Sequence, residues 1–362
     1  MELLSREFYS IQSWLLPELV EELGELTKKQ CEFVKAVELL DPIRFIDKFN
    51  WIGIGRKPSD RLSLVKAFIA KPIFQYTQTS ILIDNIKSSP VLRRLCGWET
   101  SREVPSESTF SRAFSVFAET EFPQLIYKSV ISCKIGNKLF GHKSTDSTSV
   151  KGRERSCRKN TPSQKIKGKR GRPKKGTVIT KEPRRLELQL NRTLHENLED
   201  LPIGCDWGVK KDSKGKKHSW RGYKLHLDCV DGDIPVSAVV TSASVHDSQV
   251  AIPLSQMSKE RVANLYDLMD SAYDSPEIHQ YSRDNNRIPI IDNNPRRGEK
   301  KQMCPAKAVR YNERTTAERV NSELKDNYAL ETIRVKGHKK VSCHIMFAVL
   351  ALAAKKIFNL IP

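Results

Sequence analysis

Two aspartates follow stretches that read as β-strands, and this placement could bring them together. Asp146 comes after residues 138–145, which are weakly strand-like, and Asp270 comes after the apolar residues 263–269. In α/β domains, functional side chains gather at the carboxyl ends of strands. Taken alone, each aspartate is more typical of a helix or turn cap than of a ligand. Further acidic residues near the two aspartates are needed before the pattern indicates a catalytic or metal-binding site.

A third acid, Glu318, lies in a stretch that is expected to form a helix at residues 313–325. Because a helix advances about 100° per residue, one face would carry a carboxylate between two cations and a phenol. That face comprises Tyr311, Arg314, Glu318 and Lys325. The opposite face is apolar and could pack on a sheet; it comprises Ala317, Val320 and Leu324. A surface helix with i, i+4 ion pairs, such as Arg314 with Glu318, would give the same pattern.

The three acids Asp146, Asp270 and Glu318 would form one site if the fold brought them together. Three carboxylates without a cation repel one another and raise each other's pKa. Two Mg²⁺ or Mn²⁺ ions about 3.5–4 Å apart remove this conflict, because hard oxygen ligands suit hard cations. Such a site would activate a water or a 3′-hydroxyl in phosphodiester chemistry. Asp267 and Glu323 are the alternative second and third ligands.

The elements that would position these acids alternate between strand and helix. Residues 223–229 alternate apolar and polar side chains, which is typical of a half-buried strand, and a turn at 231–233 leads into another strand at 234–241. Further helices are expected at 245–257 and 313–325, and further strands at 263–269 and 287–291. His246 and Asp247 would cap the first of these helices or support the ligands. This order of elements predicts a mixed α/β domain.

The chain before residue 133 reads as helical. Ser106 is a candidate N-cap, and the apolar side chains that follow it have helical spacing. They are Phe110, Ala113, Phe114 and Phe117. Residues 61–86 show a similar pattern, which Pro72 interrupts. A helical region of this kind could be a DNA-binding head, a dimerisation module or a scaffold.

The charge of the chain favours a polyanion as its partner. The chain carries 62 Lys and Arg against 43 Asp and Glu, a formal net charge of +19, and residues 151–185 contain 15 of the basic residues against two acids. Nucleic acid and an acidic membrane surface both suit such a surplus. An Arg-Gly-Arg-Pro core in this segment could enter a narrow A·T minor groove while flanking lysines meet phosphates. The residues concerned are Lys169, Arg170, Arg172, Lys174 and Lys175. A solvated basic linker is the alternative.

Several features argue against a membrane or secreted protein. The N-terminus lacks the layout of a secretory signal, and the most apolar stretch, residues 345–354, is shorter than the roughly 20 residues that span a bilayer. The basic segment also lacks apolar residues that could insert into a membrane. The eight cysteines form no close pair in the sequence, which is typical of reduced thiols in a cytosolic protein. We therefore expect a cytoplasmic protein that does not contact membranes.

Several short motifs occur in an order that is typical of one protein family. The helical face described above has the spacing Tyr-x2-Arg-x3-Glu-x6-Lys, and residues 270–275 match Asp-x-Gly-Tyr-Asp-Ser except at Ala272. The other motifs lie at residues 104–112, 146–148, 220–226 and 243–248. On these motifs the chain resembles the DDE-type transposases of bacterial insertion sequences, in the insertion sequence 4/5 superfamily. The resemblance covers residues 136–362 and, less fully, the helical region.

This resemblance implies a fold and a set of site residues. The fold would be an RNase H-like mixed sheet with flanking helices at residues 133–362, after an all-helical DNA-binding or dimerisation domain at residues 1–132. The basic segment would belong to an insertion at residues 151–205. The resemblance implies that the catalytic metal ligands for two Mg²⁺ or Mn²⁺ ions are Asp146, Asp270 and Glu318. It also implies that DNA is contacted by Tyr311, Arg314 and Lys325.

The resemblance further implies an activity and its partners. The protein would bind the inverted repeats at the ends of its element, cleave phosphodiester bonds there and join the 3′-hydroxyl ends to target DNA. It would act as a homodimer in the synaptic complex and associate with the nucleoid in the cytoplasm. The alternatives are an RNase H-like nuclease without strand transfer and a catalytically inactive DNA-binding derivative of a transposase.

Overall fold

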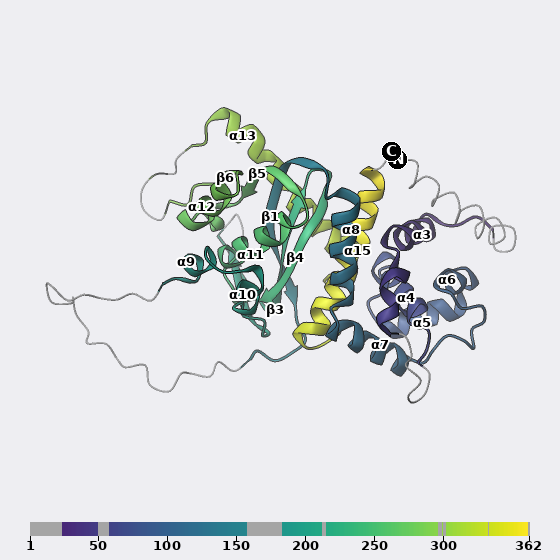
Figure 1. Cartoon of the computed structure of the whole chain (residues 1–362). Coiled ribbons are helices and arrows are strands. Elements are labelled where there is room, and N and C mark those ends of the chain that lie inside the picture. Colours follow the sequence, from purple (N-terminus) through teal and green to yellow (C-terminus); the bar gives the residue numbers. More distant parts are fainter. Residues whose placement is uncertain are drawn as a thin grey trace.

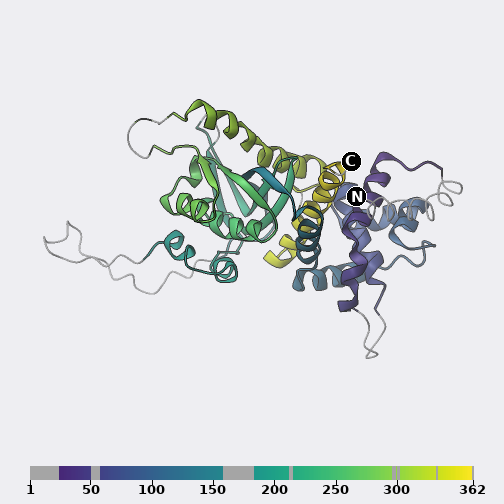
Figure 2. The same ribbon diagram turned by 45° about the horizontal axis from the view of Figure 1, so that its top comes forward.

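In the computed structural model, helices from the first part of the chain lie to one side of a β-sheet that has its own flanking helices (Figure 1). Two helices, α8 (Phe122–Ile135) and α15 (His338–Leu360), run side by side between these two parts (Figure 2). The structure describes residues 24–49, 58–157, 183–211, 215–295, 299, 302–331 and 333–360. An all-helical region followed by a mixed α/β domain is the order that the sequence predicts.

The helical region follows the apolar patterns of its sequence. Ser106 immediately precedes α7, and the predicted apolar face of that helix is buried, with Phe110 and Phe117 both 0% exposed. α4 ends one residue after Pro72, so the interruption predicted at this proline is confirmed. The elements before α8 are α3 (Lys28–Leu40), η1 (Pro42–Phe49), α4 (Arg61–Ile73), α5 (Thr79–Ser88), α6 (Pro90–Cys96) and α7 (Glu107–Glu119).

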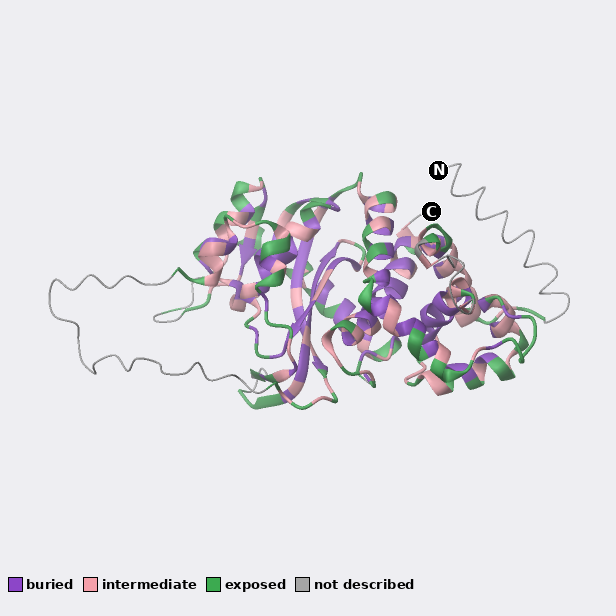
Figure 3. Ribbon diagram, turned by 60° about the horizontal axis from the view of Figure 1, so that its bottom comes forward, coloured by how far each residue is buried: buried purple, intermediate pink, exposed green. Residues whose placement is uncertain are grey.

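Helix α15 joins the two parts of the molecule. It packs against α3, α4, α7 and α8 and also against strand β4, so a single apolar core extends from the helical region to the sheet (Figure 3). Within this core the ring of Phe347 lies 5.8 Å from that of Phe68 and 6.5 Å from that of Phe114. The expectation that the apolar stretch at 345–354 is too short for a membrane needs correction, because α15 has 23 residues and is long and apolar enough. However, 72% of its apolar window is buried inside the protein, as in the core helix of a soluble protein.

The α/β domain is built on a mixed sheet of six strands. The strand order is β2-β3-β1-β5-β6, and β4 also pairs with β3. β1 is antiparallel to β3 and parallel to β5, which is itself parallel to β6. The strands are β1 (Leu139–Lys151), β2 (Asp206–Lys211), β3 (Lys217–Val230), β4 (Ile234–Ser242), β5 (Ala263–Met269) and β6 (Ile288–Ile291). This is the predicted RNase H-like mixed sheet, with helices on both faces.

The flanking helices contact different faces of the sheet because side chains alternate along β1. Lys143 of β1 donates to Ser255 of α11, whereas its neighbour Ser144 donates to the backbone oxygen of Arg314, beside α14. The helices and turns of this domain are α9 (Arg185–Gln189), α10 (Leu194–Glu199), α11 (Ser248–Lys259), η2 (Ser271–Tyr273), α12 (Pro276–Asp284), α13 (Pro305–Tyr311), η3 (Asn312–Arg314) and α14 (Thr315–Asn327).

Two strands differ from their predictions. The sequence predicts that the first strand ends before Asp146. In the structure β1 continues to Lys151, because its second half remains paired with β3. β3 was predicted to be half-buried, yet its polar residues His226 and Asp228 are 1% and 0% exposed. β3 lies inside the sheet and both of its faces are covered, so the period-two pattern there does not mark a solvent-facing side. β2 was not predicted at all.

The basic insertion begins and ends at neighbouring backbone positions. The Cys157 N–H donates to the Cys205 carbonyl oxygen over 2.8 Å, which closes the base of the insertion. Its last part is folded, because Asn197 on α10 donates to Gln256 on α11 over 2.9 Å. The predicted minor-groove segment, with Lys169, Arg170, Arg172, Lys174 and Lys175, lies outside the described residues.

Candidate active site

A cavity of about 440 Å³ lies where β1, β2, α14 and the end of β5 meet. Its lining contains predicted site residues from positions far apart in the sequence: Asp146, Asp270, Arg314, Glu318 and Lys325. The other lining residues are Ser147, Thr148, Lys210, Asn321 and Ser322. The cavity therefore combines carboxylates with cations, and all of its lining residues are polar.

Asp146 lies in the middle of β1 rather than at the end of a strand. The alternation of side chains along β1 turns Asp146 toward α14, where Asn321 donates its amide N–H to the carboxylate over 2.9 Å. Burial raises the pKa of Asp146 to about 6, and the nearby charge of Asp270 adds to this rise. The Lys210 charge, the Ser147 backbone N–H and the Asn321 hydrogen bond act in the opposite direction. The Asp146 carboxylate is therefore largely removed from water, and the hydrogen bond from Asn321 fixes its orientation.

Asp270 directly follows β5, as predicted, and begins the short η2 turn. One of its carboxylate oxygens accepts a hydrogen bond from the Ala272 N–H over 2.9 Å, so the acid caps its own turn. Burial raises the pKa of Asp270, against the effect of this hydrogen bond, and the charge of Asp247 also raises it. The capping role that the sequence allowed is therefore present, and it leaves the carboxyl group at the edge of the cavity.

Arg314 and Glu318 form the ion pair that their spacing suggested, with 2.7 Å between Nη1 and Oε1. The predicted face from Tyr311 to Lys325 does not lie on a single helix, however, because the 3₁₀ turn η3 separates α13 from α14. Tyr311 ends α13 and does not line the cavity, although the Arg314 guanidinium lies 5.5 Å from the centre of its ring. The opposite face packs inward as predicted, with Ala317, Val320 and Leu324 all 0% exposed.

The two alternative acids have partners elsewhere. Asp267 is 0% exposed on the α11 face of the sheet, where its carboxylate lies 3.3 Å from the Lys143 ammonium. Glu323 pairs with Lys355 and Lys356 on α15, at 2.8 Å and 2.7 Å. Neither acid lines the cavity. Both are occupied in ion pairs that stabilise the packing of the domain.

His246 and Asp247 lie beside the first turn of α11. Asp247 is at the N-cap position, but its side chain makes no capping hydrogen bond and instead pairs with the Lys224 ammonium over 2.8 Å. His246 Nδ1 lies 2.8 Å from the Ser248 hydroxyl. Asp247 therefore makes no side-chain cap and acts on the site through its charge near Asp270. His246 provides the expected cap instead, because its Nδ1 accepts the Ser248 backbone N–H over 3.4 Å.

Five lining residues were not predicted as site residues, and two of them, Asn321 and Lys210, act directly on Asp146. Asn321 follows Glu318 by three residues, and this helical spacing could have placed it on the same face. Lys210 lies on β2, a short edge strand, and no pattern in the chain marks it. Such a residue can be identified as part of the site only from the folded structure, in which its hairpin lies against the cavity.

The donor set fits divalent cations, although no cluster for one ion is complete. Among the described residues, no three His, Cys, Asp or Glu side chains lie close enough to share a metal ion. The desolvated carboxylates of Asp146 and Asp270 repel each other, and a hard cation would relieve this repulsion. Glu318 pairs with Arg314 through Oε1, so its other oxygen could serve as the third ligand. Asp146 and Asp270 would thus hold a cation first.

Comparison with known proteins gives two matches to family models. The model described as Transposase DDE domain matches residues 142–354, which is more than half of the chain. The model described as Transposase domain (DUF772) matches residues 21–115, within the helical region. No curated protein and no solved structure matches the chain.

Proposed function

The chain belongs to the family of transposases with a DDE domain, and from this premise we propose that it cuts and joins DNA at the ends of its own element. It would recognise the inverted repeats of an insertion sequence of the 4/5 superfamily, because Tyr311, Arg314, Glu318 and Lys325 have the spacing of that group. The observation that carries the proposal is the cavity that Asp146 and Asp270 share with two cations, Arg314 and Lys325.

The side chains of the cavity would divide the work between acids and cations. Asp146 and Asp270, with Glu318, would hold divalent ions, and Asn321 would keep Asp146 in position through its hydrogen bond. Arg314 and Lys325 would bind phosphates of the DNA end, since cations beside the acids lie where the scissile phosphate must pass. Tyr311 would support Arg314 by its ring contact.

Two Mg²⁺ or Mn²⁺ ions suit this arrangement of oxygen donors. When bound, such ions favour deprotonation of an attacking water or 3′-hydroxyl and offset charge on the leaving oxygen. The protein side chains would exclude bulk water and fix the phosphate by charge, which is where their contribution to rate arises. A homodimer would be needed to hold two element ends at once.

A strand-joining assay tests the proposal. The substrate is a duplex that contains the DNA flanking the reading frame, incubated with the protein, Mg²⁺ and a plasmid target. We expect nicks at the element ends and products in which their 3′ ends are joined to the plasmid. Cuts without joined products would support a nuclease, and neither cuts nor joined products would indicate an inactive derivative. Either result would contradict the proposal.

The basic segment should contribute affinity without contributing chemistry. We expect that exchanging its five hook residues for Gln makes the negative slope of log K against log salt shallower by up to about 4.5, because each phosphate contact contributes roughly 0.9. The residues exchanged are Lys169, Arg170, Arg172, Lys174 and Lys175. The loss of binding affinity should be larger on an A·T-rich duplex than on a G·C-rich duplex, since the hook suits a narrow minor groove. Equal salt slopes for variant and wild type would instead support the linker alternative.

A further inference from the structure

Lys210 is a cation of the cavity that belongs to none of the motifs from which the site was predicted. It lines the cavity together with Asp146 and Asp270, but it comes from β2 rather than from α14. Burial raises the pKa of both aspartates, and the Lys210 charge acts against this rise in each case. Its ammonium is therefore close enough to act on both acids.

Lys210 is carried by a hairpin arm, which we define as β2 together with residues 217–222 of β3. The arm leaves the central sheet at Gly222, whose φ is 154° and where a Cβ would lie 2.1 Å from the Val150 carbonyl oxygen. No other residue type fits such a close approach of two backbones. The arm therefore turns at a point that the packing of the sheet determines.

Packing at the base of the arm holds it in position. Trp220 is only 9% exposed, and its indole N–H donates to the Tyr223 carbonyl oxygen over 3.1 Å. Gly208 lies against the same indole, since a Cβ on it would come within 2.5 Å of the ring. Lys210, two residues further along β2, is thus presented by a supported strand and not by a free loop.

The charge of Lys210 is available to a ligand. Arg314 is paired with Glu318, and Lys224 at the root of the arm is paired with Asp247. Within the part of the chain that the structure describes, neither Lys210 nor Lys325 has an ion-pair partner. The cavity thus has one available cation from the arm and another from α14.

We propose that Lys210 binds a phosphate of the DNA strand that is cut, so that the strand is held by the arm as well as by α14. This inference rests on the proposed function, because it takes the phosphodiester backbone of DNA as the ligand. A merely electrostatic role, in which Lys210 only offsets the charge of the acids, would need no contact with DNA. Salt dependence separates these roles, because only a contact with phosphate changes the number of counterions released.

The test compares Lys210→Gln, Lys210→Arg and wild type on the duplex that flanks the reading frame. Binding is measured without divalent ions over a series of salt concentrations. We expect Lys210→Gln to make the negative slope of log K against log salt shallower by about one, and Lys210→Arg to keep the wild-type slope. With Mg²⁺, single-turnover cleavage by Lys210→Gln should fall about a hundredfold, as for other lost contacts to reacting phosphates.

Lys217→Gln is the matched control, because Lys217 is exposed on the same arm and does not line the cavity. It should cleave at close to the wild-type rate. A wild-type salt slope for Lys210→Gln, or a failure of Lys210→Arg to restore it, would overturn the inference. If wild type itself cuts no DNA, the proposed function fails, but the salt slopes still decide whether Lys210 contacts phosphate.

Discussion

Replacing Asp270 by Asn should reduce strand cleavage at least about a thousandfold, a loss of the size seen when an essential catalytic group is removed. The amide has the shape of the carboxylate, and its oxygen can still accept the hydrogen bond from the Ala272 N–H. The variant therefore loses the negative charge beside Asp146 and little else. Single-turnover cleavage of the flanking duplex with Mg²⁺ measures the effect, and the melting temperature should remain close to that of wild type.

Glu313→Gln is the control for this loss of one negative charge. Glu313 is exposed in η3, close to Glu318 in the chain, but it does not line the cavity. Its variant should cut as fast as wild type. If Asp270→Asn cut equally fast, the assignment of Asp270 would be wrong.

The acids of the site could be predicted from the sequence because their spacing reflects local structure. Asp270 directly follows an apolar strand, and Arg314 and Glu318 are one helical turn apart, so short-range patterns place all three. Asp146 was selected for the wrong local reason, since it lies within β1 and not after it. Lys210 could not be found in this way, because its place depends on how the arm turns at Gly222.

The fold was predictable where apolar residues set the period. β5 has the bounds that its apolar run predicts, and the buried face of α7 is the one that its spacing predicts. Prediction failed where polar residues are buried, as in the second half of β1 and on one face of β3. Ser, Thr and Asp in a strand resemble a loop in sequence. In the second half of β1 the extended backbone is explained by pairing with β3, since the pairing with β5 ends at Thr145.

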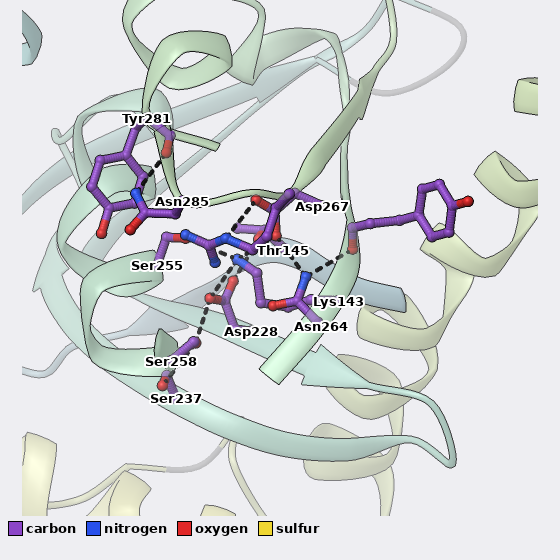
Figure 4. A network of polar contacts seen from close by, with 12 residues as sticks. Lys143, Thr145, Asp228, Ser237, Ser255, Ser258, Asn264, Asp267, Tyr281 and Asn285 are labelled. Carbon is purple, nitrogen blue, oxygen red and sulfur yellow. Dashed lines mark hydrogen bonds and ion pairs between the residues drawn. The ribbon is translucent and has the colours of Figure 1, made fainter. Parts of the chain in front are cut away.

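The buried polar side of the sheet is a network built around one lysine (Figure 4). Lys143 is 0% exposed, and its ammonium lies 3.0 Å from an oxygen of Asp228 and 3.3 Å from one of Asp267. The strand register brings them together, because Lys143 pairs with Asp267 across β1 and β5. Further members of this network include Thr145, Ser255, Ser258, Asn264 and Arg287. The members named here therefore come from three strands, from α11 and, in the case of Arg287, from the residue immediately before β6.

The network also explains how Asp146 faces the cavity. The charged side chains bind one face of β1 to α11, and alternation along the strand then turns Asp146 to the other face. Burial opposes ionisation of Asp267, but Lys143 and Arg287 hold its pKa below the ordinary value. Both acids of the network therefore depend on the lysine for charge balance.

Lys143→Met should lower the free energy of unfolding by about 3–5 kcal/mol, because it leaves two buried carboxylates without their shared cation. Methionine retains much of the lysine's volume, so the loss comes from uncompensated charge and not from a cavity. Denaturant unfolding at neutral pH measures the change. Lys138→Met is the control: Lys138 is exposed just before β1, and its exchange should change stability by less than about 0.5 kcal/mol.

A second variant separates charge from packing at this position. Adding Asp228→Asn to Lys143→Met removes one uncompensated carboxylate and leaves Asp267 paired with the buried Arg287, so the double variant should regain part of the lost stability. If Lys143→Met were as stable as wild type, the network would contribute nothing to the fold. If the double variant were less stable than Lys143→Met, hydrogen bonds to Asp228, such as that from Ser258, would outweigh the charge balance. We expect the charge term to be larger, because Asp228 is fully buried and Lys143 is its ion-pair partner.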